Sequence, residues 1–508
     1  MAKNILLLMT DQQRSDYVGY LPDGKALTPN ISRIAEHAHF TSCITPNPIC
    51  TPARTSLITG RYSRQIGSLT MSGDLFPQIP TFMQALQKAG YKTYGIGKYH
   101  YSHLAGAITP RGCGYDHVAM SEETKAYGYD YVWELAGKQT MVPNYDFYID
   151  YMNQKGMANQ VRDYMLECGG LNGDTADHNY DTALPWPFDE EDFIDIVTGR
   201  IAREQLTQHP ENQPFYMYVS FCSPHKPYGV PQRYLDMFPL EEQDDFILPD
   251  GQVLTEAEKM TLYRQRRAAK AMIRLIDDQI GLILADLEKR DMLKDTLILF
   301  TSDHGDMLGD HYMIQKGVPW RQATNVPLAA WLPGEEKTGA NHHVVQLFDI
   351  AATILDYAGL DPQMALSRDW PAYNNLIPSR SFLPILEGKS WKIRDWAYAE
   401  CDFTEEHFGT TPEEVMKKRG FQRGNAWRMI VTDTTKYVKY LNYEVPGAAY
   451  EEFYDMANDP SESVNLIDQI AYQEQIQEAR SRMEYVIDKY PPAQTNWITK
   501  FSTNREYC

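Results

Sequence analysis

The sequence predicts an α/β fold, with a large, mostly parallel central sheet flanked by helices and a smaller C-terminal subdomain with a short antiparallel sheet and a helix. Short uninterrupted apolar runs recur along the first part of the chain, as expected for strands buried on both faces of a parallel sheet. Amphipathic stretches with helical spacing separate these runs. The pattern changes after about residue 370, so we expect one domain over residues 1–370 and a subdomain over 371–508.

Four apolar runs each end in polar or charged residues. They cover residues 5–9, 94–97, 215–221 and 297–300. In open α/β sheets, ligands bind at the edge formed by the carboxyl ends of the strands. The side chains directly after these runs are therefore candidates for one shared site.

Helices are expected between the strands, over residues 30–37, 81–89 and 255–287. The stretch from about 120 to 190 is rich in Tyr, Asp, Asn and Gly and has no clear periodicity. It predicts long loops over the ligand-binding side of the sheet, since loops of that length are usually functional.

The C-terminal part has a different pattern. Residues 427–431 and 436–440 predict strands joined by a turn, and residues 469–489 predict a helix. This pattern indicates a small antiparallel sheet with one helix packed on it.

The charge limits the partners of the chain. Its 508 residues carry a net charge of −20, which argues against nucleic acid or an anionic membrane as the main partner. A small anionic substrate is still compatible with this charge, because basic side chains and a metal can make a pocket locally positive.

Cysteine usage and hydropathy predict the compartment. The seven cysteines are widely spaced and form no CxxC pair, so reduced thiols are expected rather than a disulfide framework or a zinc motif. The apolar run at residues 5–9 is too short for a signal peptide or a membrane span. We therefore expect a cytoplasmic location.

The most specific motif begins at Cys50. Pro52 suits the first turn of a helix with Thr51 as its N-cap, and Gly60 suits the helix end. Cys50 is therefore expected just before a short helix, near its positive N-terminus, where an anion or an activated nucleophile is stabilised.

This segment resembles the formylglycine signature of type I sulfatases, a family of the alkaline phosphatase superfamily. The matching residues are Cys50, Pro52, Arg54, Leu57, Thr59, Gly60 and Arg61. In that family a maturation enzyme oxidises the cysteine to an aldehyde, which is then hydrated. The resemblance spans almost the whole chain, and the segment from Glu452 to Leu466 is similar to the family's C-terminal subdomain.

The resemblance also implies a metal site. It places one divalent cation among Asp11, Gln12, Cys50, Asp303 and His304. Oxygen-rich ligands suit Ca²⁺, with Mg²⁺ or Mn²⁺ as alternatives. Many family members carry two acidic residues where this chain has Asp11 and Gln12, a departure that lowers the negative charge of the site.

Three more segments resemble family motifs and supply basic residues. They supply Lys98 and His100, with Tyr99 in place of a tryptophan, and His225 and Lys316. Of the neighbouring residues, Lys226 is expected to be a solvated surface lysine, whereas His311 could be structural or could line the pocket.

The resemblance implies a role for each residue of this set. Asp303 would be a base for the nucleophile, and Arg54 would hold it. Lys98, Lys316 and the cation would stabilise charge on the sulfonyl oxygens. His225, with Lys316, would protonate the leaving oxygen, and His100 would accept a proton when sulfate is released. The expected activity is hydrolysis of sulfate monoesters.

Three other functions are compatible with parts of this set of motifs. A phosphonate monoester or phosphodiester hydrolase on the same scaffold is the nearest, because such relatives also carry the Cys50-type motif with residues equivalent to Gln12 and His304. A Ser/Thr-type phosphotransferase of the superfamily fits less well, since a cysteine stands at the nucleophile position. A non-catalytic anion-binding protein would not need the complete acidic and basic set. Sugar sulfates are the first expectation for the substrate, with aryl and small alkyl sulfates as alternatives.

Overall fold

The computed structural model describes residues 3–69, 75, 79–101, 115–168, 183–248, 253–367, 376–402, 426–441 and 451–493. The predicted boundary between residues 370 and 371 lies outside these ranges and stays a prediction. The large predicted sheet is present and has nine strands in the order β4-β3-β5-β1-β6-β7-β2-β8, with β9 paired to β2. A second, four-stranded sheet has the order β10-β11-β12-β13.

The strands of the large sheet are β1 (Asn4–Asp11), β2 (Ala38–Ile44), β3 (Lys92–Lys98), β4 (Tyr131–Leu135), β5 (Phe215–Pro224), β6 (Thr296–Ser302), β7 (Asn325–Trp331), β8 (Gly339–Asn341) and β9 (Val345–Gln346). Strands β4, β3, β5, β1 and β6 run parallel, and β7 is antiparallel to both β6 and β2. The expectation of a mostly parallel sheet is confirmed.

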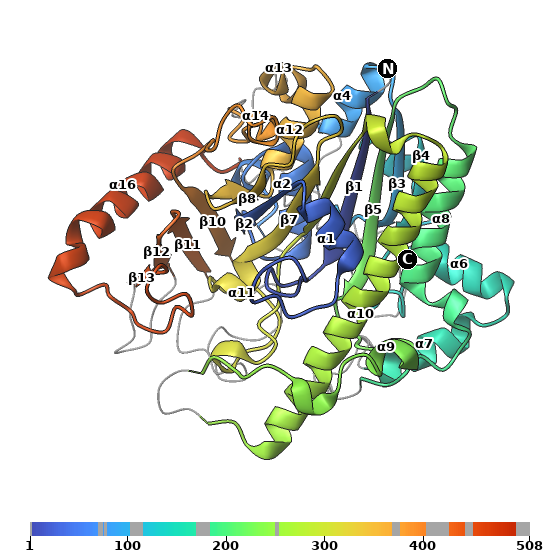
Figure 1. Cartoon of the computed structure of the whole chain (residues 1–508), viewed down its shortest axis with the longest axis horizontal. Coiled ribbons are helices and arrows are strands. Elements are labelled where there is room, and N and C mark those ends of the chain that lie inside the picture. The colour runs from blue at the N-terminus through green and yellow to red at the C-terminus, as the bar shows by residue number, and fades with distance from the viewer. Residues whose placement is uncertain are drawn as a thin grey trace.

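Helices cover both faces of this sheet (Figure 1). The helices of the larger part are α1 (Pro29–Ala35), α2 (Cys50–Thr59), α3 (Ser63–Ile66), α4 (Phe82–Lys88), α5 (Ser121–Lys125), α6 (Phe147–Gln154), α7 (Ala158–Glu167), α8 (Ile194–Gln208), α9 (Gln232–Leu235), α10 (Glu256–Lys289), α11 (Arg321–Thr324), α12 (Asp349–Tyr357), α13 (Pro362–Leu366) and α14 (Leu383–Leu386). Strand β1 shows why two layers form: Leu6 and Leu8 pack with α1, α8 and α10, whereas Ile5, Leu7 and Met9 pack with α2, α4 and α12.

The expectation of long loops from about residue 120 to 190 was wrong for the described part of that stretch. It contains α5, β4, α6 and α7, and Tyr148 and Tyr164 pack in the core. The two rings are buried and are therefore unavailable for stacking on a sugar ring.

The C-terminal part has the predicted antiparallel sheet and helix. It consists of β10 (Ala397–Asp402), β11 (Ala426–Val431), β12 (Thr435–Tyr440), β13 (Glu451–Asp455) and α16 (Gln473–Lys489). One face of this sheet packs on α16, which lies at the outside of the molecule (Figure 1). The other face, with Trp427 and Met429, packs with Ile44 and Ile49 of the large domain.

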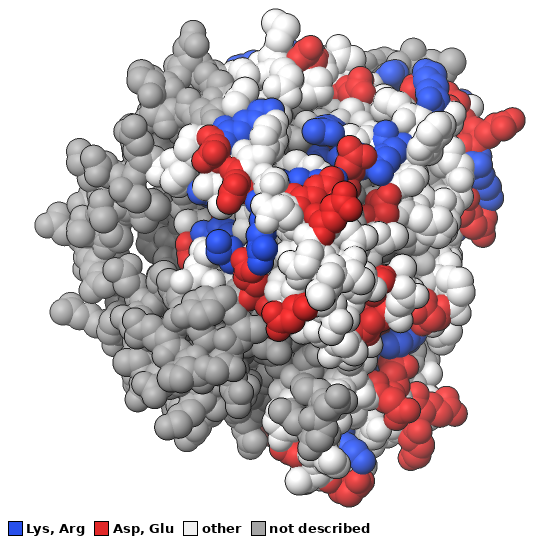
Figure 2. All heavy atoms as spheres, turned by 90° about the vertical axis from the view of Figure 1, so that its left-hand side faces the viewer, with Lys and Arg blue, Asp and Glu red and all other residues white. Residues whose placement is uncertain are grey.

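The surface on this side of the molecule carries charges of both signs. Figure 2 shows lysine and arginine side chains interspersed with aspartate and glutamate side chains among the described residues. Arg480 and Arg482, for example, pair with Glu451 and Glu478. Such mixing is typical of a solvated surface and not of a binding surface for a polyanion.

Candidate active site

Two carboxylates lie side by side at the carboxyl edge of the large sheet. Strands β1 and β6 are parallel neighbours, with Thr10 opposite Ser302. Asp11 and Asp303 follow in this register, and both side chains are buried. The backbone N–H of Gln12 donates to Asp303 Oδ1 over 3.0 Å, which ties the two strand ends together.

Cys50 lies at the first residue of α2. The predicted Thr51 cap was wrong: Ile49, in an extended conformation, precedes the helix, and no side chain caps it. The Ile49 side chain packs against the C-terminal sheet, so tertiary packing sets this helix start. The predicted end is confirmed, because Gly60 has a φ of 65°, which glycine adopts without strain.

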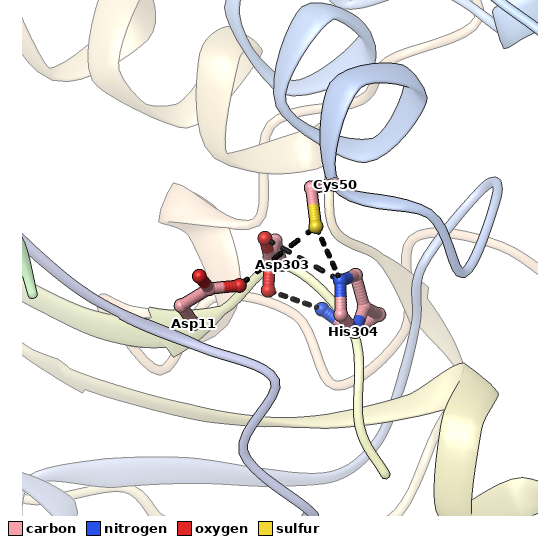
Figure 3. Close-up of side chains that lie close together, drawn as sticks. All are labelled: Asp11, Cys50, Asp303 and His304. Atoms are coloured by element: carbon pink, nitrogen blue, oxygen red, sulfur yellow. Dashed lines mark hydrogen bonds and ion pairs between the residues drawn. The ribbon is translucent and has the colours of Figure 1, made fainter. Parts of the chain in front are cut away.

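Asp11, Cys50, Asp303 and His304 converge (Figure 3). One donor atom from each lies within 4.8 Å of all the others. Cys50 Sγ lies 3.2 Å from His304 Nε2 and 3.9 Å from Asp11 Oδ1, and His304 Nε2 lies 3.6 Å from Asp303 Oδ2. Because His304 Nδ1 lies 3.0 Å from the carbonyl oxygen of Gly305, it is assigned the proton, and the lone pair of Nε2 points into the cluster.

Basic side chains neutralise both carboxylates. Lys98 Nζ donates to Asp11 Oδ2 over 2.6 Å, and Arg54 Nε donates to Asp303 Oδ2 over 2.7 Å. Arg54 also donates to the Lys98 carbonyl and to the hydroxyls of Tyr218 and Ser220, so its guanidinium is fixed. Burial opposes ionisation of Asp11, but Lys98 and its other cationic neighbours hold the pKa of Asp11 well below its usual value.

Lys316 and Gln12 close another side of the cluster. Lys316 Nζ donates to Gln12 Oε1 over 2.7 Å and to Cys50 Sγ over 3.0 Å. Gln12 Nε2 donates to Asp306 Oδ2 in turn, so the amide oxygen of Gln12 faces Lys316. Burial opposes ionisation of Cys50, yet Lys316 and Lys98 lower the pKa of its thiol well below the usual value.

Both predicted histidines are buried beside this cluster. Burial lowers the pKa of His100, and the Cys50 thiol opposes that effect. Burial and Lys316 together lower the pKa of His225 well below its usual value, while its Nδ1 lies 2.7 Å from the Lys226 carbonyl oxygen. Without a bound anion, both imidazoles are therefore favoured in the neutral form.

The expectation that Lys226 is a solvated surface lysine was wrong. Of the two alternatives for His311, a structural role or a place in the pocket lining, the structure supports the first. Only 4% of Lys226 is exposed, so it is a buried lysine and not a solvated one. His311 is buried and stacks on Trp320, with ring centroids 4.7 Å apart. This contact gives His311 a structural role.

Sequence reasoning missed two residues that support the site. Asp306 accepts hydrogen bonds from Gln12 and from the backbone N–H groups of Leu308 and Gln315. Its position three residues after Asp303 could have indicated that its carboxylate lies close to the cluster. Lys138 donates to Ser223 Oγ and to the Pro227 carbonyl, on either side of His225, and no motif marks it.

The donor set fits a divalent cation. Two carboxylates and one imidazole nitrogen converge at one sheet edge, the Gln12 amide oxygen lies beside them on Lys316, and Lys98 and Arg54 orient the carboxylates. An α/β fold with such a cluster, a cysteine at a helix start and two lysines is that of a hydrolase of anionic esters.

The comparisons identify the family. The chain belongs to the Sulfatase family, whose model matches residues 3–360, and residues 309–489 match a second model described as "N-sulphoglucosamine sulphohydrolase, C-terminal". The expected sulfuric ester hydrolase and the sulfatase resemblance are thereby confirmed.

Relatives match over most of the chain. An arylsulfatase of Clostridium perfringens is 27% identical and covers 94% of this chain and 92% of its own length. An N-acetylglucosamine-6-O-sulfatase of Bacteroides thetaiotaomicron is 26% identical, over 96% of this chain and 86% of its own. A multifunctional alkaline phosphatase superfamily protein of Trinickia caryophylli is 25% identical, over 92% of both chains.

A solved structure supports the fold. The phosphonate monoester hydrolase of Agrobacterium radiobacter superposes with a TM-score of 0.74 at 21% identity, over 96% of each chain. This similarity extends over the C-terminal part, so the arrangement of large sheet and small sheet is that of a known fold.

Proposed function

We propose that this sulfatase hydrolyses sulfate monoesters with a formylglycine made from Cys50 and one divalent cation, Ca²⁺ before Mg²⁺ or Mn²⁺. The observation that carries the proposal is the convergence of Cys50 with Asp11, Asp303 and His304. Arg54, Lys98 and Lys316 donate hydrogen bonds to members of this cluster. Asp11, Gln12, Asp303 and His304 would hold the cation beside residue 50. The hydrated aldehyde supplies a hydroxyl nucleophile, and the cation supplies a Lewis acid that lowers its pKa.

The residues around residue 50 would bind and orient the sulfate group. Lys98 and Lys316 would donate to the sulfonyl oxygens, since both ammonium groups already lie at the cluster. Arg54 would orient the carboxylate of Asp303, which is the proposed acceptor of the proton of the nucleophile.

The two histidines would move protons. A bound sulfate monoester is an anion, so it would favour protonated His225, which could then donate to the leaving oxygen together with Lys316. His100 would accept a proton in the step that releases sulfate. Its ring is buried next to Cys50, so it lies beside the residue that would lose the proton.

Mass spectrometry of the tryptic peptide from Ile34 to Arg54 tests the nucleophile. In protein from a host with a maturation enzyme, we expect the mass loss of a thiol-to-aldehyde change at Cys50 and not at Cys43. Cys50→Ala should abolish turnover of an aryl sulfate, whereas Cys43→Ala, at another buried free cysteine, should retain it. An active Cys50→Ala enzyme would overturn the proposal.

The proposed substrate is a small organic or oligosaccharide sulfate. The names of two relatives, an arylsulfatase and an N-acetylglucosamine-6-O-sulfatase, support aryl and sugar sulfates equally. A phosphonate monoester or phosphodiester hydrolase is the second candidate, because Gln12 and His304 both lie at the cluster. Rates on an aryl sulfate and an aryl phosphonate, measured side by side, separate the two.

The described helices can be checked for a membrane span, but they do not reveal the compartment. No helix in the described ranges is both long and apolar enough to span a bilayer. The cytoplasmic location stays a prediction.

A further inference from the structure

The cluster has a different donor set before Cys50 is converted. The unconverted chain offers a sulfur, an imidazole nitrogen and two carboxylates, one from each of Cys50, His304, Asp11 and Asp303. Sulfur and imidazole donors favour Zn²⁺ over Ca²⁺ or Mg²⁺. No closely spaced cysteine pair marks this site in the sequence, because its ligands come from three separate segments.

The spacing of the donors suits a tetrahedral ion. Ligands at the usual zinc distances of about 2.0–2.3 Å in a tetrahedron lie roughly 3.5 Å from one another. The separations are 3.2 Å for Cys50 Sγ to His304 Nε2, 3.6 Å for His304 Nε2 to Asp303 Oδ2, and 3.9 Å for Cys50 Sγ to Asp11 Oδ1. The other three pairs of donor atoms lie within 4.8 Å of each other, so the side chains would close in around the ion to complete the tetrahedron.

The donors are already oriented by outer partners. The Gly305 carbonyl fixes the His304 tautomer, so that Nε2 faces the cluster. Lys98 holds Oδ2 of Asp11, which leaves Oδ1 directed at Cys50. Lys316 Nζ lies 3.0 Å from Cys50 Sγ and can remain hydrogen-bonded to a metal-bound sulfur. Hydrogen bonds that orient the ligand side chains in this way are typical of metal sites in proteins.

We propose that the chain with an unconverted Cys50 binds one thiophilic divalent cation of the Zn²⁺ class through Cys50, His304, Asp11 and Asp303. Binding forms a metal–sulfur bond with the Cys50 thiolate, any proton still on the sulfur passes to the solvent, and no oxidation state changes. Conversion of Cys50 to the aldehyde removes the sulfur donor, so the preference then moves to hard cations. Only this last step rests on the proposed function.

Cobalt titration tests the site without any assay of hydrolysis. Protein from a host lacking the maturation enzyme, with the thiol verified by peptide mass, is stripped of metal and titrated with Co²⁺. We expect one equivalent to give thiolate-to-cobalt charge-transfer absorption, and Zn²⁺ to abolish it. Cys43→Ala should keep the band, and Cys50→Ser, the mildest replacement of the ligand, should lose it. A wild-type protein without the band, or a Cys50→Ser protein with the same band, would overturn the proposal.

Alkylation gives a second measurement on the same sample. We expect Zn²⁺ to slow the reaction of Cys50 with iodoacetamide at least tenfold, and Ca²⁺ to leave it within twofold. Equal protection by both ions would contradict a sulfur–metal bond. Failure of the proposed function would appear separately, as an unmodified or inactive enzyme from a host that has the maturation enzyme.

Discussion

The indole N–H of Trp427 donates a hydrogen bond of 3.0 Å to the carbonyl oxygen of Gly317. Trp427 belongs to β11 of the C-terminal sheet, and Gly317 directly follows Lys316. The same indole lies in the hydrophobic cluster that contains Ile49, the residue before Cys50. One side chain of the small sheet therefore contacts the segments that carry two of the proposed active-site residues.

Trp427→Phe should reduce turnover of an aryl sulfate by about tenfold, with a smaller change in KM. The substitution leaves the buried Gly317 carbonyl without its donor, which costs roughly 1–3 kcal/mol and loosens the Lys316 segment. Trp391→Phe is the matched control, since 74% of Trp391 is exposed. If a Trp427→Phe protein were destabilised but kept the wild-type kcat, the indole would have no role in positioning Lys316.

Gln12→Glu should lower stability but raise the affinity for a divalent cation, because it restores the acidic pair found in many family members. The new carboxylate would face the Asp306 carboxylate, which now accepts a hydrogen bond from the Gln12 amide. Removing that bond between buried groups and adding a like charge should cost about 2–4 kcal/mol. Urea unfolding and calcium titration would measure the two effects.

The double variant Gln12→Glu with Asp306→Asn is the control for this prediction. An asparagine can donate where Asp306 now accepts, so the pair would be restored with its polarity reversed. The double variant should recover most of the lost stability. Additive losses would show that Gln12 and Asp306 are not coupled.

Removal of divalent cations with EDTA should abolish hydrolysis and leave the fold intact. Lys98 and Arg54 already neutralise the two buried carboxylates, so the chain does not depend on a metal to offset their charges. Circular dichroism should stay unchanged, while Tm falls by the amount that ligand binding contributes. Ca²⁺, Mg²⁺ and Mn²⁺ should be compared for recovery of activity. Full activity in metal-free protein would exclude the proposed cofactor.

The contribution of Lys138 to stability should rise between pH 8 and pH 10.5. Burial lowers the pKa of Lys138 to about 8, with Asp195 opposing. Between that value and the unfolded pKa near 10.5, the unfolded chain binds a proton that the folded chain does not, so stability increases with pH. The gain is at most about 3 kcal/mol. In urea unfolding, the difference in unfolding free energy between wild type and Lys138→Met should shift in favour of the wild type over this pH range.

The sequence was a good guide wherever strands end in charged residues. Asp11, Lys98, His225 and Asp303 were placed correctly at one edge because the carboxyl ends of parallel strands meet there. Five strands of the large sheet, β2, β4, β7, β8 and β9, were not predicted. Strands β8 and β9 have only three and two residues, and none of the other three is followed directly by a charged residue. The sheet class could thus be predicted without its complete strand order.

Contacts between distant segments could not be predicted. The residues next to Lys226 in the sequence are typical of a surface segment. Its burial follows only from the packing around the end of β5. The support that Asp306 gives to Gln12 and that Lys138 gives to the His225 segment depends on side-chain reach across the fold. A motif identifies the reacting groups but leaves out the residues that orient them.

The packing of Ile49 and Trp427 in one hydrophobic cluster constrains how this enzyme can be recombined. A chimaera that takes its C-terminal sheet from a relative would bring a foreign partner to the start of α2 and to the segment after Lys316. Substrate range is therefore more safely re-engineered by point changes at the pocket than by exchange of the C-terminal part. For the same reason, the two parts should drift together in evolution, with a change on one side of the cluster selecting a change on the other.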